Sequence, residues 1–386
     1  MQADMSLTIA LVAGEDSGDQ LGAALIKSLK SRFPDCHFVG MGGERMRKAG
    51  LECWWDCSEL AVFGLFEVLR HFRKIWHIRK TVRQRLLEMK PDVFIGIDAP
   101  DFNLGLEKQL KKAGIRTVHY VSPTVWAWRA WRTKKIKRSV DLVLCLFPFE
   151  PEFLSQHGIQ AAFVGHPMAD QIESVSSPVE ARRSLGLREQ GPVYALLPGS
   201  RMGEVERLTG PMLEAARLLK SEHPDTVFVA ALANPRAAEY FNTQLGARKD
   251  LELLAIEGRV RDVIAAADVV ICASGTVTLE TLLINRPMVV TYRLAASTYK
   301  LARATGLVKA KQISLPNILA ARILVPELIQ ENATARRIAT EASAWIDDQQ
   351  RRDNVKEEFQ KIHRTLQCNA SERAAEEISK ILGPEQ

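Results

Sequence analysis

The chain has 386 residues and a mass of 43.1 kDa, which exceeds one ordinary hydrophobic core and predicts two domains. Hydrophobic residues make up 46% and charged residues 25% of the sequence, a globular composition that excludes a largely disordered protein. The net charge of +6 and the pI near 9.0 favour an anionic partner, with nucleic acid, a phosphorylated metabolite and an acidic membrane surface as the alternatives.

The six cysteines are scattered and lack paired CxxC spacing, so we expect free thiols in a reducing compartment rather than disulfides or a metal site. Residues 1–6 contain no basic segment followed by an apolar run of signal-peptide length. No stretch approaches the roughly 18 consecutive apolar residues of a transmembrane helix. These features predict a protein on the cytoplasmic side of the membrane.

Apolar runs alternate with helical patterns along the chain. In the first half, strands are expected at residues 8–13, 92–97, 116–121 and 141–146, with helices at 20–30 and 105–113. Serine, proline and glycine interrupt this rhythm at residues 170–188. Strands then resume at residues 193–197, 226–231, 269–272 and 287–292. This order predicts an α/β protein with a doubly wound parallel sheet in each half.

The domain division follows from the same rhythm. We expect a Rossmann-like domain at residues 1–170, a linker at 171–188 and a second Rossmann-like domain at 189–340. Residues 341–386 are helical and heavily charged, and we expect closing helices that pack across the domains. Two such domains would place their strand ends on either side of a cleft, which suits a transferase with two substrates.

An acidic loop follows the first predicted strand. Residues 14–19 read Gly-Glu-Asp-Ser-Gly-Asp, and the three carboxylates argue against a dinucleotide pyrophosphate, as does the lack of GxGxxG spacing. We interpret Glu15, Ser17 and Asp19 as contacts to a sugar acceptor and its phosphate. Capping of the following helix by one of these side chains is the alternative.

Asp98 directly follows the strand predicted at residues 92–97, and Pro100 fixes the turn after it. A carboxylate in this position is a candidate general base that removes a proton from an incoming hydroxyl. Because an unperturbed aspartate has a pKa near 3.9, either proton transfer accompanies bond formation or burial raises the pKa. Asp101 is either an alternative base or a turn former.

Two loops of the second half suit a nucleoside diphosphate. Gly199, Ser200 and Arg201 follow the strand at residues 193–197, where a glycine allows close backbone approach and an arginine can pair with a diphosphate leaving group. An ordinary surface arginine is the alternative.

The second loop opens a helix after the strand at residues 269–272. Ser274, Gly275 and Thr276 would direct backbone N–H groups at a phosphate, and Glu280, one turn on, would accept the ribose hydroxyls. Taken alone this is also an ordinary helix start. Further on, Asn317 either binds the sugar or its phosphates or caps the helix that follows it.

Residues 61–80 combine apolar and basic side chains near helical spacing, as in a helix that lies on an anionic lipid surface. The apolar candidates are Val62, Phe66, Leu69, Phe72 and Trp76. An amphipathic helix that covers its own core would look similar. Residues 126–138 carry three tryptophans and six basic residues, which suits phosphate head groups; without a recognised nucleic-acid fold we expect no nucleic acid.

Together these motifs resemble the lipid-A-disaccharide synthase family of glycosyltransferases. The matching segments are residues 13–19, 40–43, 96–103, 197–201, 274–276 and 315–317. They occur in this order between about residues 10 and 320, and the segments around Asp98 and Arg201 are the most specific. The final helices match only in general character.

The resemblance implies a GT-B fold and transfer of 2,3-diacylglucosamine from UDP to 2,3-diacylglucosamine 1-phosphate, giving a β-1,6-linked disaccharide and UDP. It also implies inversion at the anomeric carbon, a peripheral position on the inner membrane, and no required metal or cofactor. Asp98 would deprotonate the acceptor's 6-hydroxyl, and the loops of the second half would hold UDP. A homo-oligomer is left open.

Other readings stay open on the sequence alone. One is another double-Rossmann enzyme that uses UDP-N-acetylglucosamine, such as a 2-epimerase or the peptidoglycan glycosyltransferase. A different class is a protein that binds a nucleotide or a phospholipid without catalysis. An epimerase needs no lipid acceptor, so liposome binding and dependence on acyl chains would speak against it. UDP release that requires an acceptor would speak against a protein that only binds.

Overall fold

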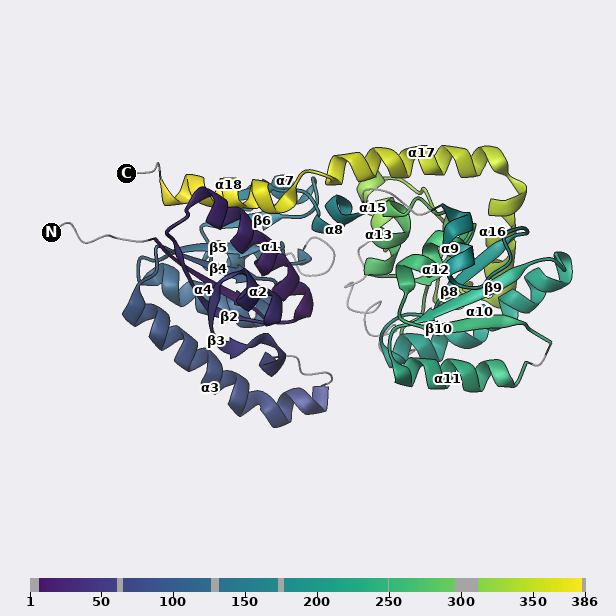
Figure 1. The fold of residues 1–386 in the computed structure, drawn as a ribbon, viewed down its shortest axis with the longest axis horizontal. Helices are drawn as coiled ribbons and strands as arrows, with labels where there is room; N and C mark the ends of the chain where they lie inside the picture. Colours follow the sequence, from purple (N-terminus) through teal and green to yellow (C-terminus); the bar gives the residue numbers. More distant parts are fainter. Residues whose placement is uncertain are drawn as a thin grey trace. The chain divides into compact units, whose positions relative to one another are not determined.

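The computed structural model describes residues 7–60, 65–125, 132–172, 177–248, 250–295 and 312–383; the side chains of residues 60 and 65–72 lie outside this description. The chain divides into two compact units (Figure 1). Unit 1 comprises Met1–Asp170 and Thr365–Gln386, and unit 2 comprises Gln171–Arg364. The segment expected as a linker therefore belongs to unit 2, and the end of the chain belongs to unit 1.

Unit 1 is built on a parallel sheet of seven strands in the order β3-β2-β1-β4-β5-β6-β7. The strands are β1 (Thr8–Ala13), β2 (His37–Gly42), β3 (Leu51–Asp56), β4 (Val93–Ile97), β5 (Arg116–Tyr120), β6 (Leu142–Cys145) and β7 (Ala161–Phe163). Its helices include α1 (Asp16–Arg32), α2 (Glu44–Ala49), α3 (Leu65–Met89), α4 (Pro100–Lys112), α6 (Thr133–Lys137), α7 (Glu150–Ser155), α8 (Pro167–Gln171) and α18 (Ala370–Leu382).

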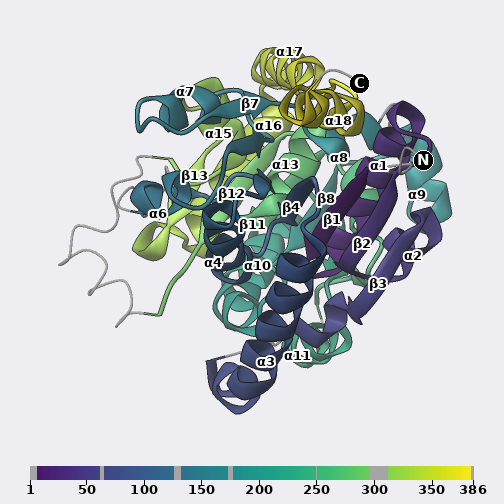
Figure 2. The same ribbon diagram turned by 90° about the vertical axis from the view of Figure 1, so that its left-hand side faces the viewer.

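Helices cover both faces of this sheet, which explains why its inner strand β1 is apolar from Ile9 to Ala13. Ile9 and Leu11 of β1 pack in a core with α1, α2 and α18, whereas Ala10 and Val12 pack in a second core with α3 and α4. Figure 2 shows α3 and α4 on one side of β1 and β2, and α1 with α2 on the other. A parallel strand buried on both faces needs a continuous apolar sequence rather than an alternating one.

Asp170 ties the last helix to unit 1. Its carboxylate accepts hydrogen bonds from the backbone N–H groups of Cys368 (2.9 Å), Asn369 (3.0 Å) and Ala370 (2.7 Å), at the start of α18. From there α18 packs beside α1 (Figure 1), and its Ala374 completes the core. A carboxylate at a helix start also suits the helix dipole.

Unit 2 has a parallel sheet of six strands in the order β10-β9-β8-β11-β12-β13. The strands are β8 (Val193–Leu197), β9 (Val227–Leu232), β10 (Leu253–Glu257), β11 (Val269–Ala273), β12 (Met288–Tyr292) and β13 (Glu327–Ile329). Its helices include α9 (Pro178–Ser184), α10 (Met202–Glu222), α11 (Pro235–Gly246), α12 (Val260–Ala266), α13 (Thr276–Leu283), α15 (Leu315–Ala320), α16 (Ala335–Asp347) and α17 (Gln349–Leu366).

The predicted strands are confirmed, two of them with identical bounds and the others within one residue at either end. Five further strands, β2, β3, β7, β10 and β13, were not predicted. The first two predicted helices begin too late, because α1 begins at Asp16 and α4 at Pro100. Most of the acidic segment expected as a loop is thus the first turn of α1.

Each sheet has one point where the strand order reverses, between β1 and β4 in unit 1 and between β8 and β11 in unit 2. At each of these points the two neighbouring strands end at about the same position along the sheet. Ala13 of β1 pairs with Ile97 of β4, and Leu197 of β8 pairs with Cys272 of β11. In open α/β sheets ligands bind outside the carboxyl ends of the strands at such a point. Each unit therefore has one position where a ligand is expected, at the reversal of strand order in its sheet.

All six cysteines are unpaired thiols, as expected. Among the helices that the structure describes, none combines the length and the apolar character needed to cross a bilayer.

Candidate functional site

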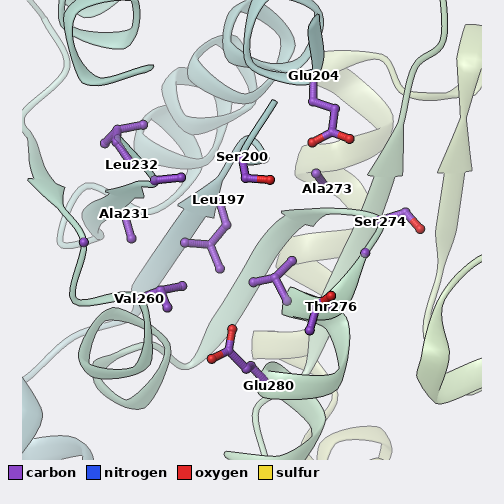
Figure 3. A pocket seen from close by; sticks show the side chains of 15 residues that line it. Leu197, Ser200, Glu204, Ala231, Leu232, Val260, Ala273, Ser274, Thr276 and Glu280 are labelled. Carbon is purple, nitrogen blue, oxygen red and sulfur yellow. The ribbon is translucent and has the colours of Figure 1, made fainter. Parts of the chain in front are cut away.

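A pocket of about 410 Å³ lies at the reversal point of unit 2, a volume typical of small-ligand sites (Figure 3). Its walls come from the carboxyl ends of β8, β9 and β11 and from the starts of α10, α12 and α13. Six residues predicted from the sequence line it: Gly199, Ser200, Ser274, Gly275, Thr276 and Glu280. The structure therefore brings the two predicted loops together around one cavity.

Gly199 is required by the shape of its loop. Its φ of +116° is one that residues with side chains rarely adopt. A β-carbon at this position would also lie 2.5 Å from Oε2 of Glu204. The absence of a side chain thus lets the backbone of residues 199–200 form part of the pocket wall.

The start of α13 forms the facing wall, with Gly275, Thr276 and Val277 lining the pocket. The positive end of a helix dipole and its backbone N–H groups favour a phosphate at this position. Ser274 contributes backbone rather than a hydroxyl, because its Oγ donates a hydrogen bond to the carbonyl of Ile313 at 2.9 Å.

Two carboxylates point into the pocket from opposite sides, those of Glu204 and Glu280 (Figure 3). Nε of Arg261 donates a hydrogen bond to Oε1 of Glu280 at 3.2 Å, and the Glu280 side chain is only 15% exposed. An oriented carboxylate is suited to accept hydrogen bonds from the hydroxyls of a ribose.

Arg201 follows the pocket loop, but its guanidinium is not part of the pocket wall. Its side chain is 85% exposed, and Nη1 lies 3.8 Å from Oε1 of Glu204. An exposed ion pair of this length contributes little energy, so little holds the guanidinium in its present direction.

Asn317 has a structural role and does not line the pocket, contrary to the prediction of a UDP contact. The side chain is fully buried. Nδ2 donates to the carbonyl of Val325 (3.0 Å) and to Glu327 (2.8 Å), while Oδ1 accepts from the N–H groups of Leu324 (2.7 Å) and Val325 (3.0 Å). These four bonds use the whole capacity of an amide, so Asn317 ties α15 to the segment before β13.

Asp98 and Glu15 lie at the reversal point of unit 1, after β4 and after β1. Asp98 and the next residue, Ala99, have left-handed backbones with φ of 48° and 44°. Strain of this kind in residues other than glycine is typical of functional turns. α4 then begins at Pro100, so Asp98 lies in the short turn between the end of β4 and the start of this helix.

Burial raises the pKa of the half-buried Asp98 above its ordinary value, and the nearby Glu15 carboxylate raises it further, whereas His119 acts in the opposite direction. A raised pKa makes a carboxylate a stronger base towards a hydroxyl. Asp101 offers no comparable environment, because its side chain is 79% exposed and its Oδ1 accepts a hydrogen bond from Arg132 at 3.2 Å.

The predicted acceptor residues divide into two groups. Glu15 and Ser17 are exposed, and the Ser17 hydroxyl donates to Oε1 of Glu15 at 2.6 Å. Asp19 is buried, and its carboxylate accepts from the N–H groups of Gly43 (2.6 Å), Arg45 (3.0 Å) and Met46 (3.0 Å). Asp19 therefore caps α2 and is not open to an acceptor, which corrects its predicted role.

The predicted membrane segment falls partly outside the described residues. Val62 is outside them, and Phe66, Leu69 and Phe72 belong to α3 but their side chains are not described. Trp76 is 57% exposed, with the Lys80 ammonium 5.5 Å from its ring centroid.

The same helix also covers the core of unit 1, because Ile78, Val82 and Leu86 are buried against the sheet. One face of α3 therefore covers the core of its own unit, and the contact with a membrane stays a prediction for the exposed face. The tryptophans at 126, 128 and 131 lie outside the described residues.

The sequence analysis missed several residues of the pocket, notably Glu204, Gly258 and the segment 231–233. Glu204 had a local signal, since it lies in the first turn of α10, where an acidic residue often receives a backbone N–H. The other positions carry no side-chain chemistry and depend on where β9 and β10 end. Among the described residues, no group of three His, Cys, Asp or Glu side chains is placed to hold a metal ion.

Comparisons with known proteins identify the family of the chain. A family model described as "Lipid-A-disaccharide synthetase" matches residues 9–380. The lipid-A-disaccharide synthase of Xanthomonas campestris pv. campestris strain 8004 is 48% identical over 377 residues, covering 97% of this chain and 86% of that protein. The lipid-A-disaccharide synthase of Pseudomonas paraeruginosa strain DSM 24068 / PA7 is 47% identical over 376 residues, covering 97% and 98%.

Similar solved structures show the fold. The UDP-GlcNAc 2-epimerase from Neisseria meningitidis bound to UDP-GlcNAc has a TM-score of 0.64 at 13% identity, covering 97% of this chain and 100% of that chain. MurG from Acinetobacter baumannii has a TM-score of 0.57 at 14% identity, covering 97% and 99%. These structures share two parallel-sheet α/β domains, as in GT-B enzymes. The chain therefore belongs to the lipid-A-disaccharide synthase family, glycosyltransferases of lipid A biosynthesis with the GT-B fold.

Proposed function

We propose that the chain transfers 2,3-diacylglucosamine from UDP to the 6-hydroxyl of 2,3-diacylglucosamine 1-phosphate, with inversion at the anomeric carbon. The observation that carries this proposal is the pocket of unit 2, where the Gly199 loop, the start of α13 and Glu280 together suit a nucleoside diphosphate. Family membership supports the lipid sugar substrates. Two similar solved structures that contain UDP or UDP-GlcNAc support a UDP-linked donor.

In the donor site, the backbone of residues 199–200 and the first turn of α13 hold the diphosphate. Glu280, oriented by Arg261, accepts hydrogen bonds from the ribose. Arg201 turns from its long ion pair with Glu204 towards the diphosphate and neutralises the charge that develops as UDP leaves. An arginine suits this task because it presents several N–H donors in a fixed plane.

In the acceptor site, Asp98 takes the proton of the 6-hydroxyl as the oxygen attacks the anomeric carbon. The bond between that carbon and the UDP oxygen breaks, and UDP departs with the electron pair. Attack from the face opposite UDP inverts the configuration. The raised pKa of Asp98 favours the proton transfer. Glu15 and Ser17, both exposed beside this turn, bind the acceptor.

The acyl chains of both substrates require access to a bilayer, and we assign the exposed face of α3 to this contact. Trp76 and Lys80 combine an aromatic ring with a positive charge, which is typical of residues at an anionic membrane surface. The protein would then be peripheral on the cytoplasmic face of the inner membrane.

The proposal is tested by incubating the protein with the UDP-linked donor and the 1-phosphate acceptor. Mass spectrometry should detect the disaccharide, NMR should show a β linkage, and UDP release should require the acceptor. UDP release or sugar epimerisation without acceptor would favour an epimerase, and UDP binding without turnover would favour a binding protein.

Asp98→Asn should lower turnover by a factor of about 10² to 10⁴ while UDP still binds, as expected for loss of a general base. Asp101→Asn is measured beside it, because a comparable loss at that position would transfer the base role to Asp101. Full turnover in Asp98→Asn would remove Asp98 as the base.

A further inference from the structure

A second cavity of unit 2 lies at the edge of the sheet opposite the nucleotide pocket. Its volume is about 330 Å³. Its wall includes residues just before β8, β11 and β12, namely Gly191, Pro192, Ala267, Asp268 and Arg286. Arg352 and Lys356 of α17 also line it. The nucleotide pocket uses the carboxyl ends of β8 and β11, so this cavity has no part in the transfer described above.

Positive charge dominates the side chains of this cavity. It is lined by three basic residues, those at positions 286, 352 and 356. Among the residues that the structure describes, Asp268 is the one acid in its wall. The carboxylate of Asp268 is already engaged, since its Oδ2 accepts hydrogen bonds from Nη2 of Arg182 and from the N–H of Val193, both at 2.8 Å. The cavity therefore keeps an excess of positive charge.

Arg286 brings a buried charge into the wall. Its side chain belongs to a residue that is only 9% exposed. Nε and Nη2 donate to the carbonyl of Ala265 at 3.3 Å and 2.9 Å, and Nη1 donates to that of Ile284 at 3.4 Å. These carbonyls lie at the ends of α12 and α13, where they carry only partial negative charge. No carboxylate of the described chain forms an ion pair with this guanidinium, so an anion beside it would be stabilised.

Lys356 points to a bound anion more directly. Its ammonium group is partly buried, and it has neither a hydrogen bond nor an ion pair with any residue that the structure describes. Burial lowers the pKa of Lys356, and the charges of Arg286 and Arg352 lower it further. Asp353 and Asp268 act in the opposite direction with smaller effects. A lysine that served only to neutralise a carboxylate would have a raised pKa.

Helix capping is the alternative for the two arginines. Nη1 of Arg352 donates to the carbonyls of Trp345 (2.7 Å) and Ile346 near the end of α16, as Arg286 does at the ends of α12 and α13. A cation at the end of a helix is favourable by itself. This alternative does not apply to Lys356, which binds no carbonyl of the described residues. Capping thus explains two of the three cations and leaves the third without a role.

We propose that this cavity binds a phosphate dianion, either free or at the end of a small ester, between the Lys356 ammonium and the guanidinium groups of Arg286 and Arg352. A guanidinium presents N–H donors in a plane that suits phosphoryl oxygens, and a lysine adds a point charge. The inference stands apart from the proposed sugar transfer, because none of these residues lines the nucleotide pocket.

The test measures binding of inorganic phosphate and of glycerol 1-phosphate to the full-length protein by calorimetric titration. The pH is about 8, where both ligands are mainly dianions, and chloride keeps the ionic strength constant. Saturating UDP is present to occupy the nucleotide pocket. Lys356→Gln and Arg352→Gln should each weaken binding at least about tenfold. The tighter ligand shows whether the site takes a free anion or an ester, and equal affinity in wild type and both variants would overturn the inference.

Lys361→Gln is the matched control. Lys361 lies on the same helix and loses the same charge, but it does not line the cavity, and its Nζ pairs with Oε1 of Glu358 at 2.7 Å. This variant should bind phosphate as the wild type does. A loss of affinity as large as that of Lys356→Gln would show a general effect of charge and would overturn the site.

The sign of the stability change gives a second measurement. Without phosphate, Lys356→Gln should raise the unfolding temperature at neutral pH, because folding places the ammonium near two other cations. This cost is complete below the folded pKa and disappears as pH rises above the unfolded value. Millimolar phosphate should raise the unfolding temperature of the wild type and not that of the variant. A less stable variant that phosphate still stabilises would contradict the proposal.

Crystals grown with tungstate, an anion of similar shape that scatters strongly, locate the site in the wild-type protein. Tungstate bound by Lys356 and Arg286 supports the proposal, and tungstate in the nucleotide pocket alone overturns it. Tungstate in the cavity with unchanged phosphate affinity in the variants would mark an adventitious ion only, which also overturns it. No sugar transfer enters these measurements, so failure of the proposed function would leave their result unaffected.

Discussion

The carboxylate of Glu204 occupies the space beside Gly199 that a side chain at residue 199 would need, with Oε2 2.5 Å from the position of a β-carbon. The two residues belong to the loop and the helix that follow β8, so the turn of the loop and the direction of Glu204 depend on each other. The shape of one wall of the nucleotide pocket follows from this contact.

Gly199→Ala should therefore weaken UDP binding by at least about tenfold, since the loop must shift to relieve the contact and the left-handed backbone. The strain alone costs about 1–3 kcal/mol. Calorimetric titration with UDP measures the change. Gly210→Ala is the control, because a β-carbon there meets nothing within 4 Å and the residue lies inside α10. It should bind UDP normally and be as stable as wild type or more so. Equal affinities in the two variants would contradict the role of the loop.

Asp98→Asn should increase the free energy of unfolding at neutral pH. Burial, aided by Glu15, raises the folded-state pKa of Asp98 above its unfolded value, so folding favours the protonated carboxyl. That stability is complete below the unfolded pKa and is lost as pH rises through the folded pKa. A neutral amide retains it at every pH. Urea unfolding at several pH values should show the variant more stable above the folded pKa and equal in acid; a less stable variant at neutral pH would refute this.

Asp19→Ala should destabilise unit 1 by about 2–4 kcal/mol, because three backbone N–H groups at the start of α2 lose their acceptor. Urea unfolding measures the loss. Asp16→Ala provides the comparison in the same turn, since Asp16 is exposed and pairs with Arg45 at 3.0 Å. Loss of an exposed pair should cost less than about 1 kcal/mol. Similar losses in both variants would argue against the capping role of Asp19.

Glu280→Ala should lower UDP affinity by about tenfold, because the ribose loses an acceptor for its hydroxyls. The sharper measurement compares UDP with 2′-deoxy-UDP: wild type should prefer UDP, and the variant should bind the two alike. Arg261→Ala should cause a smaller change in the same direction, since Arg261 only orients Glu280. Asp262→Ala, which removes an exposed pair with Arg259 nearby, should have no effect. An unchanged preference in Glu280→Ala would assign the ribose elsewhere.

Trp76→Ser should reduce binding to vesicles that contain anionic lipid, because the variant removes a large exposed aromatic ring beside Lys80. Co-sedimentation with vesicles measures the effect. Ile323→Ser is the matched control, since Ile323 is the more exposed of the two at 76% but belongs to unit 2. If both variants lose binding equally, the contact is not specific to α3; if neither does, the assignment of this face is wrong.

The strands that the sequence predicts are buried runs of mainly apolar or β-branched residues, whereas β2 is buried too and was missed. β1 is apolar after Thr8 and β8 is apolar or aromatic throughout, and their predicted bounds are those of the structure. β2 carries glycines at residues 40 and 42, β10 is partly exposed, and β13 has three residues, so none gives a continuous apolar run. Local pattern detects continuous apolar runs, and it misses strands that contain glycines, are partly exposed or are very short, because these depend on pairing with a neighbour.

The residues of the candidate site also divide into those whose position the sequence predicts and those whose role it obscures. The positions of Gly199 and Thr276 at the pocket and of Asp98 after β4 could be predicted, because ligands bind where strands end in this type of fold. We assigned Asp19 and Asn317 to ligands because the local sequence does not show their hydrogen-bond partners, which are far along the chain or are backbone groups. One partner of Asp19, for example, is the backbone N–H of Gly43, 24 residues later. A polar side chain engaged by backbone amides looks the same in a sequence as one that is available to a substrate.

The attachment of α18 to unit 1 has a consequence for synthesis on the ribosome. Unit 2 is complete once Arg364 has been added, but unit 1 still lacks the helix that packs on α1 and contributes Ala374, Ala375 and Ile378 to its core. The part of the protein that is translated first is therefore expected to be the last to finish folding. Until α18 has left the ribosome, the part of α1 that it covers stays exposed, and chaperones that bind nascent chains could bind there.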